Sequence, residues 1–296
     1  MKKIILKIYY FFFSLECKFL KFLLSDYAFF SITAKKFIFS PTISQLKAAD
    51  RDLLPRNIEK YKLLFKRLGI LKKNNGVILD IGGNIGYTAI SFREAIARKD
   101  IDIYSFEPYP PNFYFIKKNI KKHDIKLFPF GLGDSNKTMN IGFPIYTQKI
   151  KNKDNKNNTG RVGLVGLDSK SKSKESLFKA TIRHGDEFIK SMVKSSHISF
   201  IKIDVEGYEI NVLRGLIETI KLSNPIIQME ANLLTMKITN TSVHDVFHFA
   251  NEVDYSCYLF NKRKLELLKI NVPLPSKVNE IILCPKNKKL QNEVLL

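Results

Sequence analysis

From residue 76 onward, short runs of apolar residues alternate with stretches of helical periodicity, and this alternation constrains the fold more than any other feature. The apolar runs contain few polar residues, which is typical of strands buried on both faces of a sheet. Helical stretches between such strands act as the crossovers of a parallel sheet. The sequence therefore predicts an α/β fold with a mostly parallel sheet and helices on both faces. The expected strands are 76–81, 101–107, 125–130, 199–205 and 225–231, and the expected helices are 87–98, 111–122 and 206–220.

The two ends of the chain add to this core in different ways. Residues 241–253 have an amphipathic helical pattern, and the apolar runs 255–260 and 279–285 are close enough to form an antiparallel hairpin at the sheet edge. A mostly helical lead-in precedes the first strand. We therefore expect one large α/β domain over 41–296. It is interrupted at about 145–178 by a long polar insertion, which is either a disordered surface loop or a mobile lid.

The first 40 residues are predicted to form an amphipathic helical extension. Their longest uncharged run, 8–15, is far shorter than the roughly 20 residues that span a bilayer, and no signal-peptide cleavage site follows. On a helix, the basic and hydroxyl side chains share one side and large apolar side chains the other. Two explanations stay open. The helix lies in an anionic membrane interface, where each basic residue adds about 1 kcal/mol of binding, or it packs on protein.

The overall charge favours an anionic partner. The chain has 49 lysine and arginine residues against 28 acidic ones, a formal net charge of +21, although lysines spread along a chain are also typical of a solvated surface. Cys17, Cys257 and Cys284 are far apart, with no disulfide or metal-ligand spacing, which suits a reducing compartment. We therefore expect a cytoplasmic protein, either free or peripheral on the inner face of the cytoplasmic membrane.

Acidic residues follow the expected strands one after another. Open α/β sheets bind ligands where the carboxyl ends of their strands meet, so these acids are expected to share one site. A single acid of this kind is more simply a helix cap, but a series of strand ends that carry acids favours a function. The acids are Asp80, Glu107, Asp134, Asp204, Glu206 and Glu230.

The turn after the first strand separates two classes of cofactor. A dinucleotide fingerprint, G-x-G-x-x-G, requires glycine where Asn84 and Tyr87 stand. The sequence instead reads acid-x-Gly-x-Asn-x-Gly from Asp80 to Gly86, and a carboxylate before the turn suits a cationic ligand better than a pyrophosphate. Glycines here let the backbone approach the ligand closely. S-adenosylmethionine, which carries an ammonium and a sulfonium group, fits this pattern. The turn glycines are Gly82, Gly83 and Gly86.

Two further acids match the rest of such a ligand. Glu107 is placed to accept two hydrogen bonds from ribose hydroxyls, the role of an acid after the second strand of a nucleotide-binding fold. Asp134, after the third strand, is placed to accept a hydrogen bond from the adenine amino group.

These residues resemble the FkbM-type S-adenosylmethionine-dependent methyltransferases. The stretches "ILDIGGNIGYTAIS", "SFEPYPPNFYFIKKNI", "GLGDSNKT" and "FIKIDVEGYEINVLRG" occur in the order and spacing of that family, and "PIIQMEAN" resembles its following strand. The similarity covers roughly 76–232. The resemblance implies a class I methyltransferase fold, which is Rossmann-like, with S-adenosylmethionine as cofactor. It also implies O-methylation, commonly of a sugar in a polysaccharide, glycolipid or natural product.

The resemblance also implies where the cofactor binds. The methionine part is expected near the glycine turn, the ribose near Glu107 and the adenine near Asp134. One segment departs from the family: where relatives carry "TLDD", this chain has "TIRHGDEF" at 181–188, which leaves the acceptor open. The predicted cofactor-binding residues are Asp80, Gly82, Gly83, Asn84, Gly86, Tyr87, Glu107, Pro108, Gly133 and Asp134.

Methyl transfer to a hydroxyl requires in-line positioning and benefits from a base. A base within hydrogen-bond reach speeds such a reaction by roughly 10² to 10⁴. Asp204 and Glu206, at the end of the fourth strand, are the predicted catalytic residues. His184 is a rival base, because imidazole titrates near neutrality. The two carboxylates are also suited to holding a divalent cation, but two ligands are weak evidence and we favour the metal-free interpretation.

Functions from other classes stay as alternatives. The basic charge also fits a nucleic-acid methyltransferase, but amino-methylating members place Asn-Pro-Pro-Tyr or a relative where this chain has "DVEG". No nucleic-acid partner is therefore expected. The other alternative is a non-catalytic, membrane-associated binding module in glycan assembly. The expected substrate is a hydroxyl of a sugar, glycan or glycolipid precursor.

Overall fold

The structure is a computed structural model that describes most of the chain from residue 54 onward and two strands before it. No helix among the described residues is long and apolar enough to cross a membrane. The described residues are 27–31, 36–40, 54–70, 76–96, 98–142, 163–164, 178–192, 197–261, 264–269, 273–288 and 293–295.

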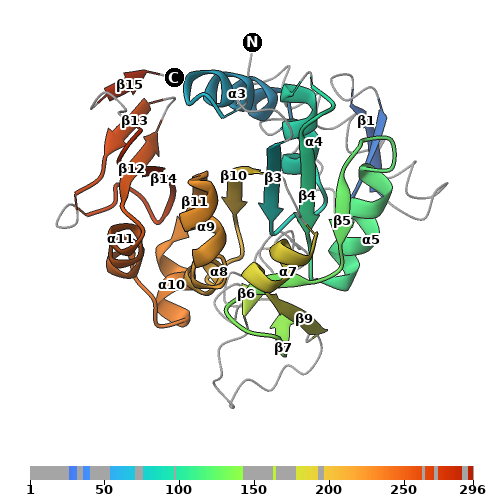
Figure 1. The fold of residues 1–296 in the computed structure, drawn as a ribbon. Coiled ribbons are helices and arrows are strands. Elements are labelled where there is room, and N and C mark those ends of the chain that lie inside the picture. The colour runs from blue at the N-terminus through green and yellow to red at the C-terminus, as the bar shows by residue number, and fades with distance from the viewer. Residues whose placement is uncertain are drawn as a thin grey trace, which may run out of the picture.

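A nine-stranded sheet forms the centre of the fold, in the order β15-β13-β12-β14-β11-β10-β3-β4-β5 (Figure 1). The neighbours from β11 to β5 pair in parallel, and β14, β12, β13 and β15 extend the sheet in antiparallel pairs. The predicted mostly parallel sheet with an antiparallel C-terminal edge is confirmed. The sequence missed β13, which lies between β12 and β14 along the chain. The strands are β3 Gly76–Ile81, β4 Asp102–Phe106, β5 Lys126–Phe128, β10 His197–Ile203, β11 Ile226–Asn232, β12 Tyr255–Asn261, β13 Lys264–Leu267, β14 Val278–Pro285 and β15 Glu293–Leu295.

Helices cover both faces of this sheet. On one face, α3 and α4 pack on β10, and the rings of Tyr61, Phe65 and Phe92 lie 5.2 to 6.4 Å from that of Phe200. On the other face, side chains of α7, α8, α9 and α11 form one buried cluster with Leu79 and its neighbours. Successive strand residues point to opposite faces, so continuous apolar strands require both layers. The helices are α3 Leu54–Arg67, α4 Tyr87–Ala95, α5 Pro110–Asn119, α7 Gly185–Met192, α8 Glu209–Gly215, α9 Ile217–Ser223, α10 Leu233–Ile238 and α11 Val243–Glu252.

A second, four-stranded sheet flanks the polar insertion, in the order β6-β9-β7-β8. None of its four strands is among the elements expected from the sequence, and β8 lies inside the insertion expected at about 145–178. The strand β9 alternates buried Ala180 and Ile182 with exposed polar residues. Because only two of its residues are apolar and buried, its sequence resembles that of a polar loop. The strands are β6 Gly131–Gly133, β7 Lys137–Gly142, β8 Gly163–Leu164 and β9 Phe178–His184. Residues 143–162 and 165–177 lie outside the described residues.

The helix expected over 206–220 begins three residues later and is divided in two. Glu206 and Gly207 have φ of +52° and +106°, which no α-helix accommodates, so residues 204–208 form a loop before α8. Buried Glu209 stabilises that loop, because its carboxylate accepts the Gly207 backbone N–H at 3.0 Å. The predicted catalytic acids therefore stand on this loop.

Most of the predicted helical extension, 1–40, lies outside the described residues. Its described parts correct the prediction: β1 (Tyr27–Ser31) and β2 (Lys36–Ser40) are antiparallel strands rather than helix. The pair lies near α5 (Figure 1). The amphipathic pattern itself, at 1–26, is not described and stays a prediction.

Candidate active site

The order of the strands creates a crevice between β3 and β10. From β3 the chain proceeds outward through β4 to β5, and β10 then pairs with the opposite edge of β3. Ligands of open α/β sheets bind at such a reversal, outside the carboxyl ends of the strands. The glycine turn 82–86 after β3 and the loop 204–208 after β10 meet there.

The turn and the loop are joined through their backbones. Gly82 and Gly83 donate hydrogen bonds to the carbonyl of Phe106 at 3.0 and 2.9 Å, and the N–H of Asp204 donates to the carbonyl of Ile81 at 3.0 Å. Gly82 has φ of +90°, and a Cβ there would lie 1.9 Å from the carbonyl oxygen of Asp204. Only glycine fits at this junction, because both the backbone conformation and the contact exclude a side chain.

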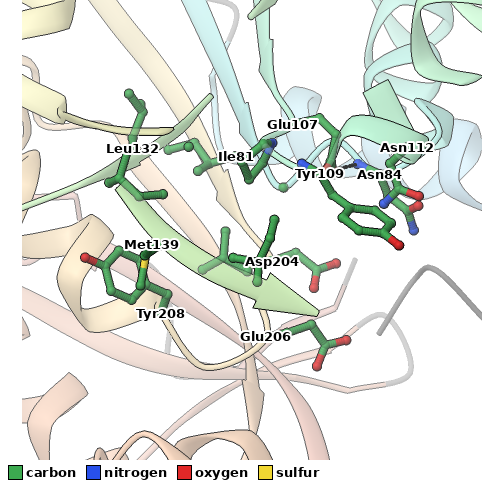
Figure 2. A pocket seen from close by; sticks show the side chains of 16 residues that line it. Ile81, Asn84, Glu107, Tyr109, Asn112, Leu132, Met139, Asp204, Glu206 and Tyr208 are labelled. Atoms are coloured by element: carbon green, nitrogen blue, oxygen red, sulfur yellow. Dashed lines mark hydrogen bonds between the residues drawn. The ribbon is translucent and has the colours of Figure 1, made fainter. Parts of the chain in front are cut away.

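A pocket opens beside this junction (Figure 2) and contains about 730 Å³ of space, part of it open to solvent. Polar side chains line one part of it, and apolar side chains from the second sheet line another. Six predicted site residues line the pocket: Gly82, Asn84, Glu107, Pro108, Asp204 and Glu206.

Glu107 is the central group of the polar part. Its Oε2 accepts the backbone N–H of Asn84 at 2.6 Å, and its Oε1 accepts that of Tyr109 at 2.8 Å. Burial raises the pKa of Glu107 to about 8, against the opposing effect of these two hydrogen bonds. The Asn112 side chain also donates a hydrogen bond to this carboxylate, which leaves about one of its four acceptor sites. The carboxylate is therefore fixed in place and able to accept one ribose hydroxyl in addition to its present donors, and a second in place of Asn112.

The apolar part of the wall comes from the second sheet and the loop after β10. Met139 and Ile141 of β7 and Ile182 of β9 line it together with Leu132 and Tyr208. Figure 2 shows Leu132, Met139 and Tyr208 on the side away from Asn84 and Asn112. A flat heteroaromatic ring gains from such an apolar wall because its faces leave water. None of these residues was predicted as a site residue, because the second sheet was not.

Asp204 and Glu206 bring two carboxylates to one side of the pocket, as Figure 2 shows. Oδ2 of Asp204 accepts a hydrogen bond from the buried ammonium of Lys202 at 2.8 Å. The Oε2 atom of Glu206 lies 3.5 Å from the side-chain nitrogen of Asn232. The structure thus brings the two predicted catalytic acids together at the pocket.

A third carboxylate stands behind this pair. Glu230, at the end of β11, offers an oxygen that lies within 4.8 Å of oxygens from Asp204 and Glu206. Burial, followed by the charges of those two acids, raises the pKa of Glu230 to about 9. Three converging carboxylates can hold a divalent cation. The alternative of a cation held by Asp204 and Glu206 therefore gains Glu230 as a third ligand. We still favour the metal-free interpretation, because Lys202 already places a positive charge 2.8 Å from Asp204.

Asp80 does not line the pocket, and its expected contact with the cofactor stays a prediction. It is fully buried beneath the glycine turn, where its Oδ2 accepts a hydrogen bond from Ser105 at 2.9 Å. Burial raises the pKa of Asp80, and the nearby charge of Lys202 opposes this. The acid therefore supports the turn from below in this structure.

Asp134 and Gly133 are not among the residues that line the pocket, although the hydroxyl of the lining residue Tyr208 lies 3.4 Å from Oδ1 of Asp134, so the contact with adenine stays a prediction. The carboxylate of Asp134 accepts hydrogen bonds from Asn211 at 2.8 Å and from Lys137 at 3.2 Å. A Cβ at Gly133 would meet the ring of Tyr208 at 2.8 Å, so this glycine serves packing. Gly131 and Leu132, two residues earlier in the chain, line the pocket instead.

The remaining predicted residues support the site from outside the wall. Gly83 and Gly86 shape the turn, and Gly86 has φ of +94° immediately before α4. Tyr87 is buried in the cluster between α4 and α5. His184, the rival base, ends β9 and does not line the pocket. Lys202 was not predicted as a site residue, although a lysine in an otherwise apolar strand indicates a buried cation with a specific partner.

The chain matches the family model described as "Methyltransferase FkbM domain" over residues 80–257, more than half of its length. The chain belongs to the FkbM methyltransferase family. The family match and the strand order establish the class I methyltransferase fold, and S-adenosylmethionine is the cofactor of this fold. The structure fits that cofactor, because the pocket combines an apolar wall, an acceptor for ribose hydroxyls and carboxylates for a cationic group.

Individual relatives are distant. "Methyltransferase 1" of Beauveria bassiana (strain ARSEF 2860) is 25% identical over 151 residues, which is 48% of this chain and 59% of that protein. The structure of methyltransferase FkbM from Methylobacillus flagellatus KT shares 15% identity, with a TM-score of 0.45 over 76% of this chain and 47% of that one. An O-methyltransferase from Bacillus cereus in complex with SAH shares 14% identity, with a TM-score of 0.43 over 82% and 88%.

Proposed function

We propose that the protein transfers the methyl group of S-adenosylmethionine to a hydroxyl group of a sugar, glycan or glycolipid precursor. The observation that carries this proposal is the pair Asp204 and Glu206, which stand at the same pocket as Glu107. A hydroxyl is a poor nucleophile while it keeps its proton, so a carboxylate beside the reacting methyl group can act as the general base that accepts this proton.

Each group then has one task. Glu107 accepts the ribose hydroxyls and fixes the adenosine, while the apolar wall with Met139 and Ile182 covers the adenine. S-adenosylmethionine, when bound, supplies the methyl carbon. Asp204 and Glu206 orient the acceptor hydroxyl in line with that carbon, and one of them accepts its proton as the oxygen attacks. Protons and charge balance, because the sulfonium loses its charge as the carboxylate is neutralised.

The partners that we propose follow from charge. A net charge of +21 suits an acceptor that carries phosphate or is presented at an anionic membrane surface. We propose that the protein works in the cytoplasm and is peripheral on the inner face of the membrane, and that it needs no nucleic acid.

Two measurements test the proposal in sequence. Calorimetric titration with S-adenosylmethionine, with NAD as control ligand, should show binding of S-adenosylmethionine alone. Labelled S-adenosylmethionine is then offered with lipid-linked and nucleotide sugars, and label is expected in a sugar product. At saturating cofactor, Glu206→Gln and Asp204→Asn should slow that transfer by roughly 10² to 10⁴ for whichever acid is the base.

The outcomes separate the parts of the proposal. A folded protein that binds NAD, or neither ligand, refutes the cofactor assignment. Binding of S-adenosylmethionine with label only in nucleic acid refutes the sugar acceptor. Wild-type rates in both acid variants would remove Asp204 and Glu206 as bases.

A further inference from the structure

A nearly buried lysine stands immediately below the proposed reactive carboxylate. Lys202 is on β10, two residues before Asp204, and its Nζ lies 2.8 Å from Oδ2 of Asp204. The Lys202 side chain is 11% exposed, whereas that of Asp204 is 34% exposed. A lysine is rarely buried to this extent without a specific partner, because removing an ammonium from water is costly.

The register of the sheet places Lys202 beside a second acid, Asp80. Its strand neighbour on β3 is Asp80, and its neighbour on β11 is Gln228. Lys202 and Asp204 share one face of β10 because side chains repeat every two residues along a strand. One oxygen of fully buried Asp80 accepts the hydroxyl of Ser105, and the other, Oδ1, has no hydrogen-bond partner. The ammonium therefore lies near one acid of the turn and contacts one acid of the pocket.

The charges around Lys202 keep it protonated. Burial by itself lowers the pKa of Lys202, but the negative charges of Asp204 and Asp80 outweigh burial and raise the pKa above its usual range. Lys60, the lysine on the neighbouring helix α3, pairs instead with Glu280 of β14 at 2.8 Å. The charged or titratable groups that face this region from the packed elements are Lys60 and Tyr61 of α3, Asp80 of β3, Glu230 of β11 and Glu280 of β14.

Resting on the proposed function, we propose that Lys202 is a positioning residue for methyl transfer, which holds the carboxylate of Asp204 at the pocket wall and compensates the buried charge of Asp80. The backbone N–H of Asp204 donates to the carbonyl of Ile81, the residue before Gly82, at 3.0 Å, so the position of Asp204 depends on that of the glycine turn. The Lys202 ammonium thus interacts with both Asp80, which lies beneath the glycine turn, and Asp204, the proposed base at the pocket.

This role has a consequence for ligand choice. S-adenosylmethionine and S-adenosylhomocysteine differ by one methyl group and by the positive charge on sulfur. A fixed, ionised Asp204 in the pocket stabilises the charged ligand over the neutral one. Removing the ammonium also removes a positive charge that by itself disfavours the sulfonium. A lower preference for S-adenosylmethionine without Lys202 therefore reports the lost orientation of the Asp204 carboxylate and not the changed charge, and it leaves the contacts shared by both ligands.

The experiment measures the affinity of both ligands by calorimetry for the wild type and Lys202→Met, at one pH and ionic strength. We expect the affinity for S-adenosylmethionine to fall about tenfold and that for S-adenosylhomocysteine by less than about threefold. The matched control is Lys126→Met, which removes an exposed lysine paired with Asp102 at 2.8 Å and should leave both affinities unchanged. Equal losses for the two ligands, or no loss, would overturn the positioning role, because a purely structural lysine affects both alike.

A second pair of variants covers a failure of Lys202→Met to fold. Asp80→Asn removes the acid that is fully buried. When it is combined with Lys202→Met, the one carboxylate that loses its partner is that of Asp204, which is partly exposed to water. This double variant is expected to fold and to prefer S-adenosylmethionine less than Asp80→Asn alone does. Failure to fold, or an unchanged preference, would overturn the proposal. A wild type that binds neither ligand would instead refute the proposed function, which is a distinct result.

Discussion

We expect the wild type to bind ribose hydroxyls more tightly as pH rises, and we expect Glu107→Gln to abolish this pH dependence. The carboxylate accepts two backbone N–H groups, at 2.6 and 2.8 Å, and burial raises its pKa to about 8. Two ribose hydroxyls donate best to the ionised form. Below the pKa, ribose binding therefore requires the release of a proton, so affinity rises with pH and levels off above about 8.

The magnitude follows from that pKa. With a pKa of about 8, about one Glu107 in ten is ionised at pH 7 and about nine in ten at pH 9. A ligand that needs the ionised form then binds about tenfold more tightly at pH 9 than at pH 7. The same pKa affects stability. In the unfolded chain Glu107 ionises near its ordinary pKa of 4.5, whereas in the folded chain it ionises only near 8. The free energy of unfolding therefore falls as pH rises between these two values.

Adenosine is the suitable probe, because the amino group of S-adenosylmethionine titrates in the same range, near 7.7–8.0. Calorimetry with adenosine at pH 7, 8 and 9 should give the tenfold rise in the wild type. Glu107→Gln should bind more weakly and without pH dependence, since an amide does not ionise and places an NH₂ against one backbone donor. A wild-type affinity that is constant over this range, or the same rise in Glu107→Gln, would refute the assignment of Glu107 to the ribose.

Two further predictions concern the turn and the extension. Gly82→Ala should lower the melting temperature and prevent binding of S-adenosylmethionine, because its Cβ would lie 1.9 Å from the Asp204 carbonyl oxygen at φ of +90°. The positive φ alone costs about 1–2 kcal/mol, and unchanged thermal melting would contradict the geometry. Deletion of residues 1–26, which precede β1, should abolish sedimentation with anionic vesicles while calorimetry shows unchanged affinity for S-adenosylmethionine. Equal sedimentation of both proteins would favour packing of that segment on protein.

The elements that the sequence predicted well are those with strong local periodicity. Four of the five parallel strands, β3, β4, β10 and β11, are nearly continuous apolar runs that the fold buries on both faces, so the run by itself predicts a strand. The strands β7 and β9 were missed because short segments that alternate polar and apolar residues form strands only when another part of the fold covers their apolar face. The break at Glu206 was missed because its positive φ depends on the loop that carries it.

The sequence by itself determined the α/β fold, the glycine turn and the row of acids at the strand ends, because each depends on the order of residues along the chain. Only the tertiary structure decided which acids line the pocket. Side-chain direction and sheet register turned Asp80 under the turn, paired Asp134 with Asn211 and set Lys202 against Asp204. These outcomes depend on neighbours that are distant in sequence, so no local pattern encodes them.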